Sequence, residues 1–410
     1  MKGRCLLKTI AIAGTFDSKG NELSYVKEVL KSLGLNTFTI HCGVFEPLTP
    51  TDVSNELVAA EIGEDIKKIA AKKDRALATE VMSKAMEKIV PRLYKEGKFD
   101  GIISIGGSGG TSLATPAMRA LPIGVPKVMV STVASGNTEQ YVGTSDIIMF
   151  PSIVDVSGLN SISTKILTNA ALAIAGMVKF EHEEKLEKKP LVAATMFGVT
   201  TPCVDTARGY LESLGYEVLV FHATGTGGKT MERLIEDGYF VGVLDLTTTE
   251  WCDELVGGVL SAGPNRLEAA AKMGIPQVVS VGALDMVNFG PIDTVPEKFK
   301  GRKLYKHNPT VTLMRTTVEE NRKLGEIIAE KLNNTKGPTA LMLPLKGVSM
   351  IDVEGGPFYG PEEDKTLFDI LRKNIDRSKV ELIEMDLDIN HRDFALTAAK
   401  KLVELIKSSK

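Results

Sequence analysis

The sequence is poor in cysteine: its 410 residues include four, and no two of them form a Cys-x-x-Cys pair. They stand far apart at Cys5, Cys42, Cys203 and Cys252. Because neither a zinc-ligand spacing nor a disulfide framework is present, we expect free thiols in a reducing compartment. The expected location is therefore the cytoplasm.

Long apolar runs and runs of basic charge are missing as well. The run Thr9–Ala13 meets Asp17 and Lys19 too early to be the core of a signal peptide. The stretch Ala170–Val178 is about half of the ~20 residues that a membrane span requires. Lys and Arg number 49 against 52 Asp and Glu, a net charge of −3, and no stretch gathers the basic charge that a nucleic-acid groove needs. We expect neither a membrane nor a nucleic-acid partner.

The sequence does contain 38 glycines and 43% apolar residues, enough for a substantial core. Short β-branched runs alternate with stretches whose apolar residues recur at helical spacing. One example is Thr9–Ala13 followed by Asn21–Leu33, which ends at Gly34. Strands that alternate with helices indicate right-handed crossovers and a mostly parallel sheet. The expected fold class is α/β.

The second half of the chain resembles the first. Residues 191–225 align with residues 10–43, and this alignment matches His41 with His222. Strand and loop segments further along recur in the same order, which indicates two similar halves. We expect two Rossmann-like, doubly wound domains with mostly parallel sheets and a cleft between them. The first domain is expected to span residues 1–182 and the second residues 190–410. The charged stretch Glu181–Lys189 is the expected linker.

A glycine-rich loop in the first half is the strongest candidate for a ligand site. Ligands of open parallel sheets bind beyond the carboxyl ends of the strands, and this loop follows a predicted strand that ends at Ile105. Glycines let the backbone approach an oxyanion, the next helix offers unpaired N–H groups, and hydroxyls bind phosphate or Mg²⁺. We favour a bound anion over a turn that only packs the helix. The loop residues are Gly106, Gly107, Ser108, Gly109, Gly110 and Thr111.

Two more loops of the first half are expected at the same sheet edge. The loop Gly14–Gly20 carries Thr15, Asp17 and Lys19. Lys19 is expected to contact phosphate, whereas Asp17 is either a metal ligand or the cap of the next helix. The other loop is polar, and its candidate residues are Ser135, Gly136 and Asn137.

The second half has a glycine-rich loop of its own, HATGTGGKTME. From Ala223 onward it fits the relaxed form of the nucleotide-binding P-loop, although the strict form requires glycine at that position. The segment Leu244–Glu250 only loosely resembles the strand that completes the metal site of P-loop ATPases. A phosphate-binding loop is therefore favoured over a true P-loop. Its candidate residues are Gly225, Gly227, Gly228, Lys229 and Thr230.

The histidines at matching strand ends, His41 and His222, are candidate general bases or ligands. A structural role with satisfied hydrogen bonds is the alternative interpretation for both.

Several long motifs, taken in order, carry a family resemblance. They are GTFDSKG, GGSGGTSLATPAMRALPIGVPKVMVSTVASGN, HATGTGGKTME and LSAGPNRLEAAAKMGIPQVVSVGALDMVNFGP. Through these motifs nearly the whole chain resembles the UPF0261 family, also called Tm-1-like ATP-binding proteins. The resemblance implies two Rossmann-like domains that bind ATP, commonly as a homodimer. Where the family reads GGRAME, this chain has Lys229 and Thr230, so the cation is kept and the likeness to a P-loop is incidental.

The expected function is binding of ATP with Mg²⁺, with phosphates on Gly107–Thr111 and with Lys19 and Asp17 beside them. Phosphoryl or nucleotidyl transfer to a small acidic metabolite is the natural chemistry of such a site. One alternative is a non-hydrolysing nucleotide-binding module that acts through protein contacts. Another is a lyase, isomerase or hydrolase of a small hydroxy or keto acid, in which His41 or His222 moves protons.

Overall fold

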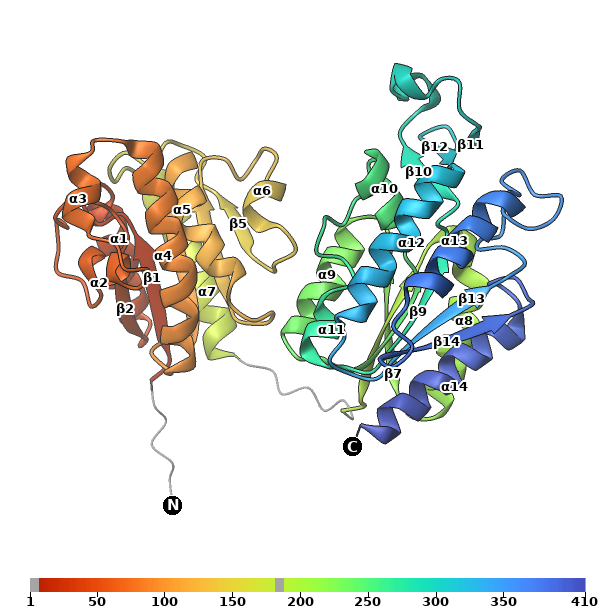
Figure 1. Cartoon of the computed structure of the whole chain (residues 1–410). Helices are drawn as coiled ribbons and strands as arrows, with labels where there is room; N and C mark the ends of the chain where they lie inside the picture. The colour runs from red at the N-terminus through yellow and green to blue at the C-terminus, as the bar shows by residue number, and fades with distance from the viewer. Residues whose placement is uncertain (1–6, 181–187, 410) are drawn as a thin grey trace. The chain divides into compact units, whose positions relative to one another are not determined.

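The computed structural model describes residues 7–180 and 188–409. The chain divides into two compact units, unit 1 (residues 1–185) and unit 2 (residues 186–410) (Figure 1). Each unit has its own mostly parallel sheet covered by helices, so the prediction of two α/β halves is confirmed. The predicted linker Glu181–Lys189 falls largely on residues 181–187, outside the described residues. The cleft expected between the halves stays a prediction.

Unit 1 contains a five-stranded parallel sheet in the order β2-β1-β3-β4-β5. Its inner strands are apolar on both faces, as parallel strands with helices on both sides are. The strands are β1 (Thr9–Gly14), β2 (Asn36–His41), β3 (Gly101–Gly106), β4 (Lys127–Ser131) and β5 (Ile148–Pro151).

The helices of unit 1 cover both faces of this sheet. One core joins alternate residues of the inner strands to α1 and α7, and another joins the remaining residues to α2, α4 and α5. The helices are α1 (Gly20–Ser32), α2 (Asn55–Ala60), α3 (Ile66–Ala71), α4 (Arg75–Lys95), α5 (Ser108–Arg119), α6 (Glu139–Val142) and α7 (Ser163–Lys179).

The strand order of unit 1 creates a topological switch point. From β1 the chain crosses to β2 on one side, and it then returns to β3 on the other side of β1. The loops after β1 and β3 therefore diverge and leave a crevice beyond the carboxyl ends of these two strands. Such a crevice is the usual ligand site of open α/β sheets.

Unit 2 contains a six-stranded parallel sheet in the order β14-β13-β9-β8-β6-β7. Its first strands repeat the connectivity of unit 1, with the switch point between β6 and β8. The strands are β6 (Leu191–Met196), β7 (Glu217–His222), β8 (Phe240–Thr247), β9 (Gln277–Gly282), β13 (Thr339–Pro344) and β14 (Val380–Met385). The α-helices are α8 (Thr201–Ser213), α9 (Thr226–Glu236), α10 (Glu250–Val256), α11 (Ala269–Met273), α12 (Val318–Asn333), α13 (Pro361–Asn374) and α14 (Arg392–Ser408).

Unit 2 also carries a small antiparallel sheet in the order β10-β12-β11, which sequence reasoning missed. Its strands have only four or five residues, too few to show a clear alternation of apolar and polar residues. They are β10 (Met286–Phe289), β11 (Leu304–Asn308) and β12 (Val311–Arg315), with the 3-10 turns η2 (Ile292–Thr294) and η3 (Glu297–Phe299) between β10 and β11; η1 (Gly198–Thr200) follows β6. Within the described ranges, no helix combines the length and the apolar character needed to cross a membrane.

Candidate functional site

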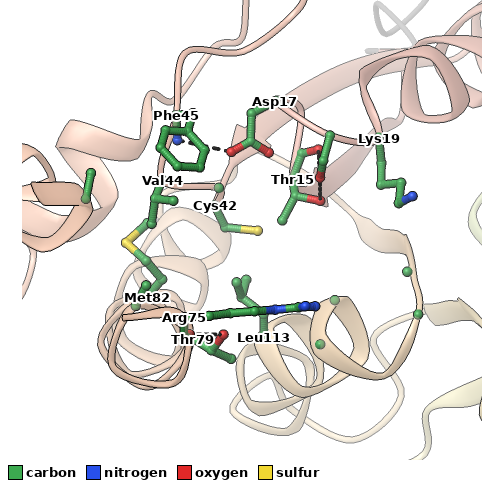
Figure 2. A pocket seen from close by; sticks show the side chains of 18 of the residues that line it. Thr15, Asp17, Lys19, Cys42, Val44, Phe45, Arg75, Thr79, Met82 and Leu113 are labelled. Atoms are coloured by element: carbon green, nitrogen blue, oxygen red, sulfur yellow. Dashed lines mark hydrogen bonds between the residues drawn. The ribbon is translucent and has the colours of Figure 1, made fainter. Parts of the chain in front are cut away.

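A cavity of about 710 Å³ lies at the switch point of unit 1 (Figure 2). The loops after β1, β2 and β3 and the segment after β5 contribute to its lining, together with residues of α3, α4 and α5. Of the predicted residues, it is lined by Thr15, Asp17, Lys19, Gly106, Gly107, Ser108, Gly109 and Gly110. The structure thus brings the first two predicted loops together at one cavity.

The glycine-rich loop presents a bare helix N-terminus to this cavity. Gly107 is the N-cap of α5 and supplies no side chain to the first turn. Within the described residues, no protein acceptor takes a hydrogen bond from the amides of Ser108, Gly109 or Gly110. These amides and the helix dipole favour an anion at this position.

Thr111 does not belong to the lining of the cavity. Its side chain is fully buried, and its hydroxyl donates to the Gly107 carbonyl at 2.8 Å and lies 2.6 Å from the Ser131 hydroxyl. We correct its predicted role accordingly: this hydroxyl joins β4 to the start of α5 and does not face a ligand.

The polar residues after β1 are already engaged within the protein. The Lys19 ammonium donates to the Val156 carbonyl, and Asp17 Oδ2 accepts the Phe45 N–H at 3.0 Å. The alternative that Asp17 caps the following helix is wrong, because the N-cap of α1 is Lys19 and no side chain caps this end. Both side chains still line the cavity, so each has atoms available to a ligand.

Arg75 is a cavity residue that sequence reasoning missed. It is the first residue of α4, after the Asp74 N-cap, and lines the cavity opposite the glycine-rich loop. A Cβ atom on Gly109 would stand 3.2 Å from its Nη2 atom, so the guanidinium passes directly over that glycine. Because Arg75 and the loop are far apart along the chain, no local sequence pattern announces this contact.

An apolar wall completes the cavity. Val44, Ile69, Met82 and Leu113 line it, together with Phe45, whose side chain is 65% exposed. Cavities that combine such walls with a few convergent polar groups are typical of small-molecule sites.

His41 has both ring nitrogens engaged with the backbone. Nδ1 accepts the N–H of Phe16 at 3.1 Å and that of Gly43 at 3.3 Å, so the ring proton lies on Nε2, which donates to the Phe45 carbonyl at 2.8 Å. The ring is fully buried and lies outside the cavity lining. This geometry supports the structural interpretation of His41 over the catalytic one.

Cys42 lines the same cavity as a buried thiol. Burial, and secondarily the charge of Asp17, hold the pKa of the Cys42 thiol far above its usual range. The reactive thiolate form is therefore suppressed, which disfavours nucleophilic chemistry at this residue.

The polar loop after β4 is not brought to this cavity. Ser135 lines a separate hollow of about 270 Å³ with Thr132 and Pro151. Asn137 Oδ1 accepts the Glu139 N–H at 3.0 Å, and Gly136, which stands between Ser135 and Asn137, lines neither hollow. Sheet order does not explain this result, because Asp155 and Val156, which follow the more distant β5, do line the first cavity.

The glycine-rich loop of unit 2 already holds an anion from the protein itself. Glu250 Oε1 accepts the N–H of Gly225 at 2.7 Å and that of Gly228 at 3.0 Å. A Cβ atom on Gly228 would lie 2.1 Å from Glu250 Oε2, and one on Gly227 would lie 1.9 Å from the His222 carbonyl oxygen. The glycines thus admit an internal carboxylate and a close strand, which corrects their predicted role in holding a ligand phosphate.

The switch point of unit 2 is filled by buried side chains. Arg266, 1% exposed, donates to Glu250 Oε2 at 2.8 Å and to Asp245 Oδ1 at 2.7 Å. Thr195 donates to Asp245 at 2.7 Å, and a Glu232 carboxylate bonds the same arginine at 3.1 Å. Burial raises the pKa of Glu232. Charged residues so far apart in sequence give no local signal of this cluster.

The remaining predicted residues of unit 2 do not converge on a site. Lys229 is exposed, and the Thr230 hydroxyl donates to the Thr226 carbonyl of its own helix at 2.7 Å. His222 is exposed and stacks on Phe197 with ring centroids 5.6 Å apart. Among the described residues, no group of three or more His, Cys, Asp or Glu side chains is placed to hold a metal ion.

Two family models match the chain. The N-terminal domain of the Uncharacterised protein family (UPF0261) matches residues 8–183, and its C-terminal domain matches residues 189–406. A UPF0261 protein of Clostridium tetani is 58% identical over 98% of this chain and 99% of its own length. One of Rhizobium meliloti is 46% identical over 96% and 98%. The ToMV resistance protein Tm-1(GCR237) of Solanum lycopersicum is 43% identical over 97% of this chain and 56% of its own length.

Proposed function

Starting from the fact that the chain belongs to the UPF0261 family, we propose that it is an ATP-binding protein whose nucleotide occupies the cavity of unit 1. The observation that carries this proposal is the placement of the cavity at the topological switch point, with a bare helix N-terminus on one side and an apolar wall on another. Nucleotides need both kinds of surface, and open α/β sheets bind them at this location.

The phosphates are placed on the amides of Ser108, Gly109 and Gly110. The Arg75 guanidinium, which passes over Gly109, supplies a fixed positive charge beside these amides. Lys19 lines the same cavity and adds a second cation. Together they neutralise a polyphosphate better than a helix N-terminus does alone.

The residues present fit a magnesium ion that arrives with the nucleotide. Mg²⁺ is usually held by one or two carboxylates together with substrate phosphates and waters. Asp17 is a carboxylate in the cavity, and the hydroxyls of Thr15 and Ser18, 2.9 Å apart, belong to residues that line the same cavity. Asp17 would be the protein ligand, and the ion would offset phosphate charge.

The geometry favours binding over proton-transfer chemistry. Of the two predicted general bases of a hydroxy-acid or keto-acid enzyme, His41 uses both ring nitrogens to hold backbone groups, and His222 lies on unit 2 away from the cavity of unit 1. We therefore propose a nucleotide-binding role without assigning a proton-transfer residue. Phosphoryl or nucleotidyl transfer to an acidic metabolite, a homodimer and a cytoplasmic location stay predictions.

Calorimetric titration with ATP, with and without Mg²⁺, tests the proposal. The wild-type protein should bind ATP, and Gly109→Leu should abolish binding because its side chain would point at Arg75 and fill the phosphate site. Gly209→Leu on the exposed face of α8, where no atom lies within 4 Å of the added Cβ, is the matched control. Absence of binding to the wild type at millimolar ATP would overturn the proposal.

A further inference from the structure

We infer that Phe45 is the platform on which the base of the bound nucleotide stacks, and that His41 and Asn55 are positioning residues that hold it there. This inference rests on the proposed function, because it assigns the second end of the same cavity. It also gives a role to His41, which the proposed function leaves without one.

Phe45 is an unusually exposed aromatic residue at the cavity. It follows β2, its side chain is 65% exposed, and it lines the cavity with Val44 and Met82. Figure 2 shows Phe45 and Met82 at one side of the cavity and Lys19 at the opposite side. The cavity therefore offers an apolar, partly aromatic end and a cationic end, which matches a ligand with a planar ring at one end and phosphate at the other.

The backbone of Phe45 is held on both sides. Its N–H donates to Asp17 Oδ2 at 3.0 Å, and its carbonyl accepts from His41 Nε2 at 2.8 Å and from Asn55 Nδ2 at 3.3 Å. His41 is fully buried, and Asn55 is 8% exposed. Buried polar side chains with satisfied hydrogen bonds specify one geometry, so they hold in place the backbone from which the exposed Phe45 ring projects.

Further contacts fix the residues around this tether. Asn55 Nδ2 also donates to the Gly43 carbonyl at 2.9 Å, and His41 Nδ1 accepts the Gly43 N–H. A Cβ atom on Gly43 would lie 2.4 Å from the Asp17 carboxylate oxygens, so only glycine admits this packing. Because the Phe45 backbone is fixed before the ligand arrives, stacking orders only the torsions of its side chain, which limits the loss of conformational entropy.

A tryptophan placed at Phe45 reports stacking directly. Trp251 is the only tryptophan of the chain, and it is buried in unit 2. Phe45→Trp should retain ATP binding, and its fluorescence should be quenched by ATP and by adenosine but not by inorganic tripolyphosphate. Quenching by tripolyphosphate to the same extent, or no quenching by bound ATP, would overturn the inference.

Truncation of the ring measures its contribution. Stacking of a base on an aromatic side chain is worth about 1–3 kcal/mol, so Phe45→Ala should weaken ATP about 5- to 150-fold and leave tripolyphosphate affinity unchanged. Leu57→Ala is the control, because Leu57 on α2 is 59% exposed and lies outside the cavity lining. If the wild type binds ATP and Phe45→Ala binds it equally well, the stacking inference fails while the proposed function stands.

The positioning role has its own readout. Asn55→Ala and, separately, His41→Gln should weaken ATP and adenosine while leaving tripolyphosphate affinity unchanged, since the amides of α5 are held by a different strand. In the Phe45→Trp background, both changes should reduce the quenching by adenosine. A uniform loss of affinity for all three ligands would instead show general damage to the fold and would overturn the positioning role.

Discussion

At the scale of single residues, unit 2 contains a buried carboxyl whose protonation should change its stability. Asp253 Oδ1 accepts the Asn288 N–H at 2.9 Å, and Oδ2 accepts from Asn288 Nδ2 at 2.7 Å. Burial nevertheless raises the pKa of Asp253 to about 7. Between about pH 4 and pH 7 the folded protein therefore holds a proton on Asp253 that the unfolded chain has released. The stability that this proton contributes is present in full below about pH 4 and is lost as the pH rises to about 7.

We expect Asp253→Asn to remove that loss. The free energy of unfolding should rise by a few kcal/mol relative to wild type at pH 8, while the two proteins should be similar at pH 4. Asn288 Oδ1 has no partner in the described structure, so a flipped Asn288 amide can accept from the amide group that this substitution introduces. Urea unfolding of both proteins across this range measures the effect, and parallel pH profiles would contradict it.

Glu250 offers a second test at this scale. Glu250→Ala leaves Arg266 short of one carboxylate and exposes the amides of Gly225 and Gly228, so it should destabilise unit 2 by about 3–5 kcal/mol. Sulfate should recover part of this loss, because the site then accepts an external anion. The measurement is the thermal midpoint with and without sulfate, with exposed Glu236→Ala on α9 as control. Equal sulfate responses in the variant and the wild type would argue against an internal anion.

At the scale of elements, two glycines within helices differ in the space that is available for a side chain. A Cβ atom on Gly227 of α9 would lie 1.9 Å from the His222 carbonyl oxygen, whereas one on Gly209 of α8 would meet nothing within 4 Å. Gly227→Ala should therefore destabilise the protein by about 3 kcal/mol. Gly209→Ala should stabilise it by about 0.5–1 kcal/mol. Chemical denaturation of the two variants compares them directly, and equal stabilities would refute the close packing of α9 on β7.

Element type is predicted well from the sequence where the pattern is long. Thr9–Ala13 and Asn21–Leu33 correspond to β1 and α1, and the glycine-rich turn after β3 does open a helix. The antiparallel strands β10–β12 escape prediction because they are short and mix polar with apolar residues without a clear alternation.

Only those residues of the candidate site that belong to a recognisable local sequence pattern are predicted. Residues that follow β1 and β3 reach the cavity as expected, because these two strands flank the switch point. Arg75 and Phe45 are missed, since they depend on how distant segments pack. The two glycine-rich loops look alike in sequence, yet one faces a cavity and the other a carboxylate supplied from the following strand–helix connection.

At the scale of the whole molecule, the units have separate hydrophobic cores. Every core cluster of described residues lies within one unit, and both units have the size of ordinary domains.

We therefore expect residues 7–180 to fold on their own and to bind ATP with the affinity of the full chain. Circular dichroism and calorimetry on this fragment make the test, with the Gly109→Leu fragment as the control. A folded fragment that does not bind ATP, beside a full chain that does, would show that residues outside unit 1 complete the site.

The Glu250 carboxylate has a consequence for how the two units respond to the cell. An anion that belongs to the chain has a fixed effective concentration at its loop, and neither dilution nor metabolism depletes it. Glu250 satisfies the amides of Gly225 and Gly228 without any solute, whereas the amides of Ser108, Gly109 and Gly110 have no protein acceptor among the described residues. If ATP occupies the cavity of unit 1 as proposed, unit 1 should gain thermal stability as the ATP concentration rises, and unit 2 should not.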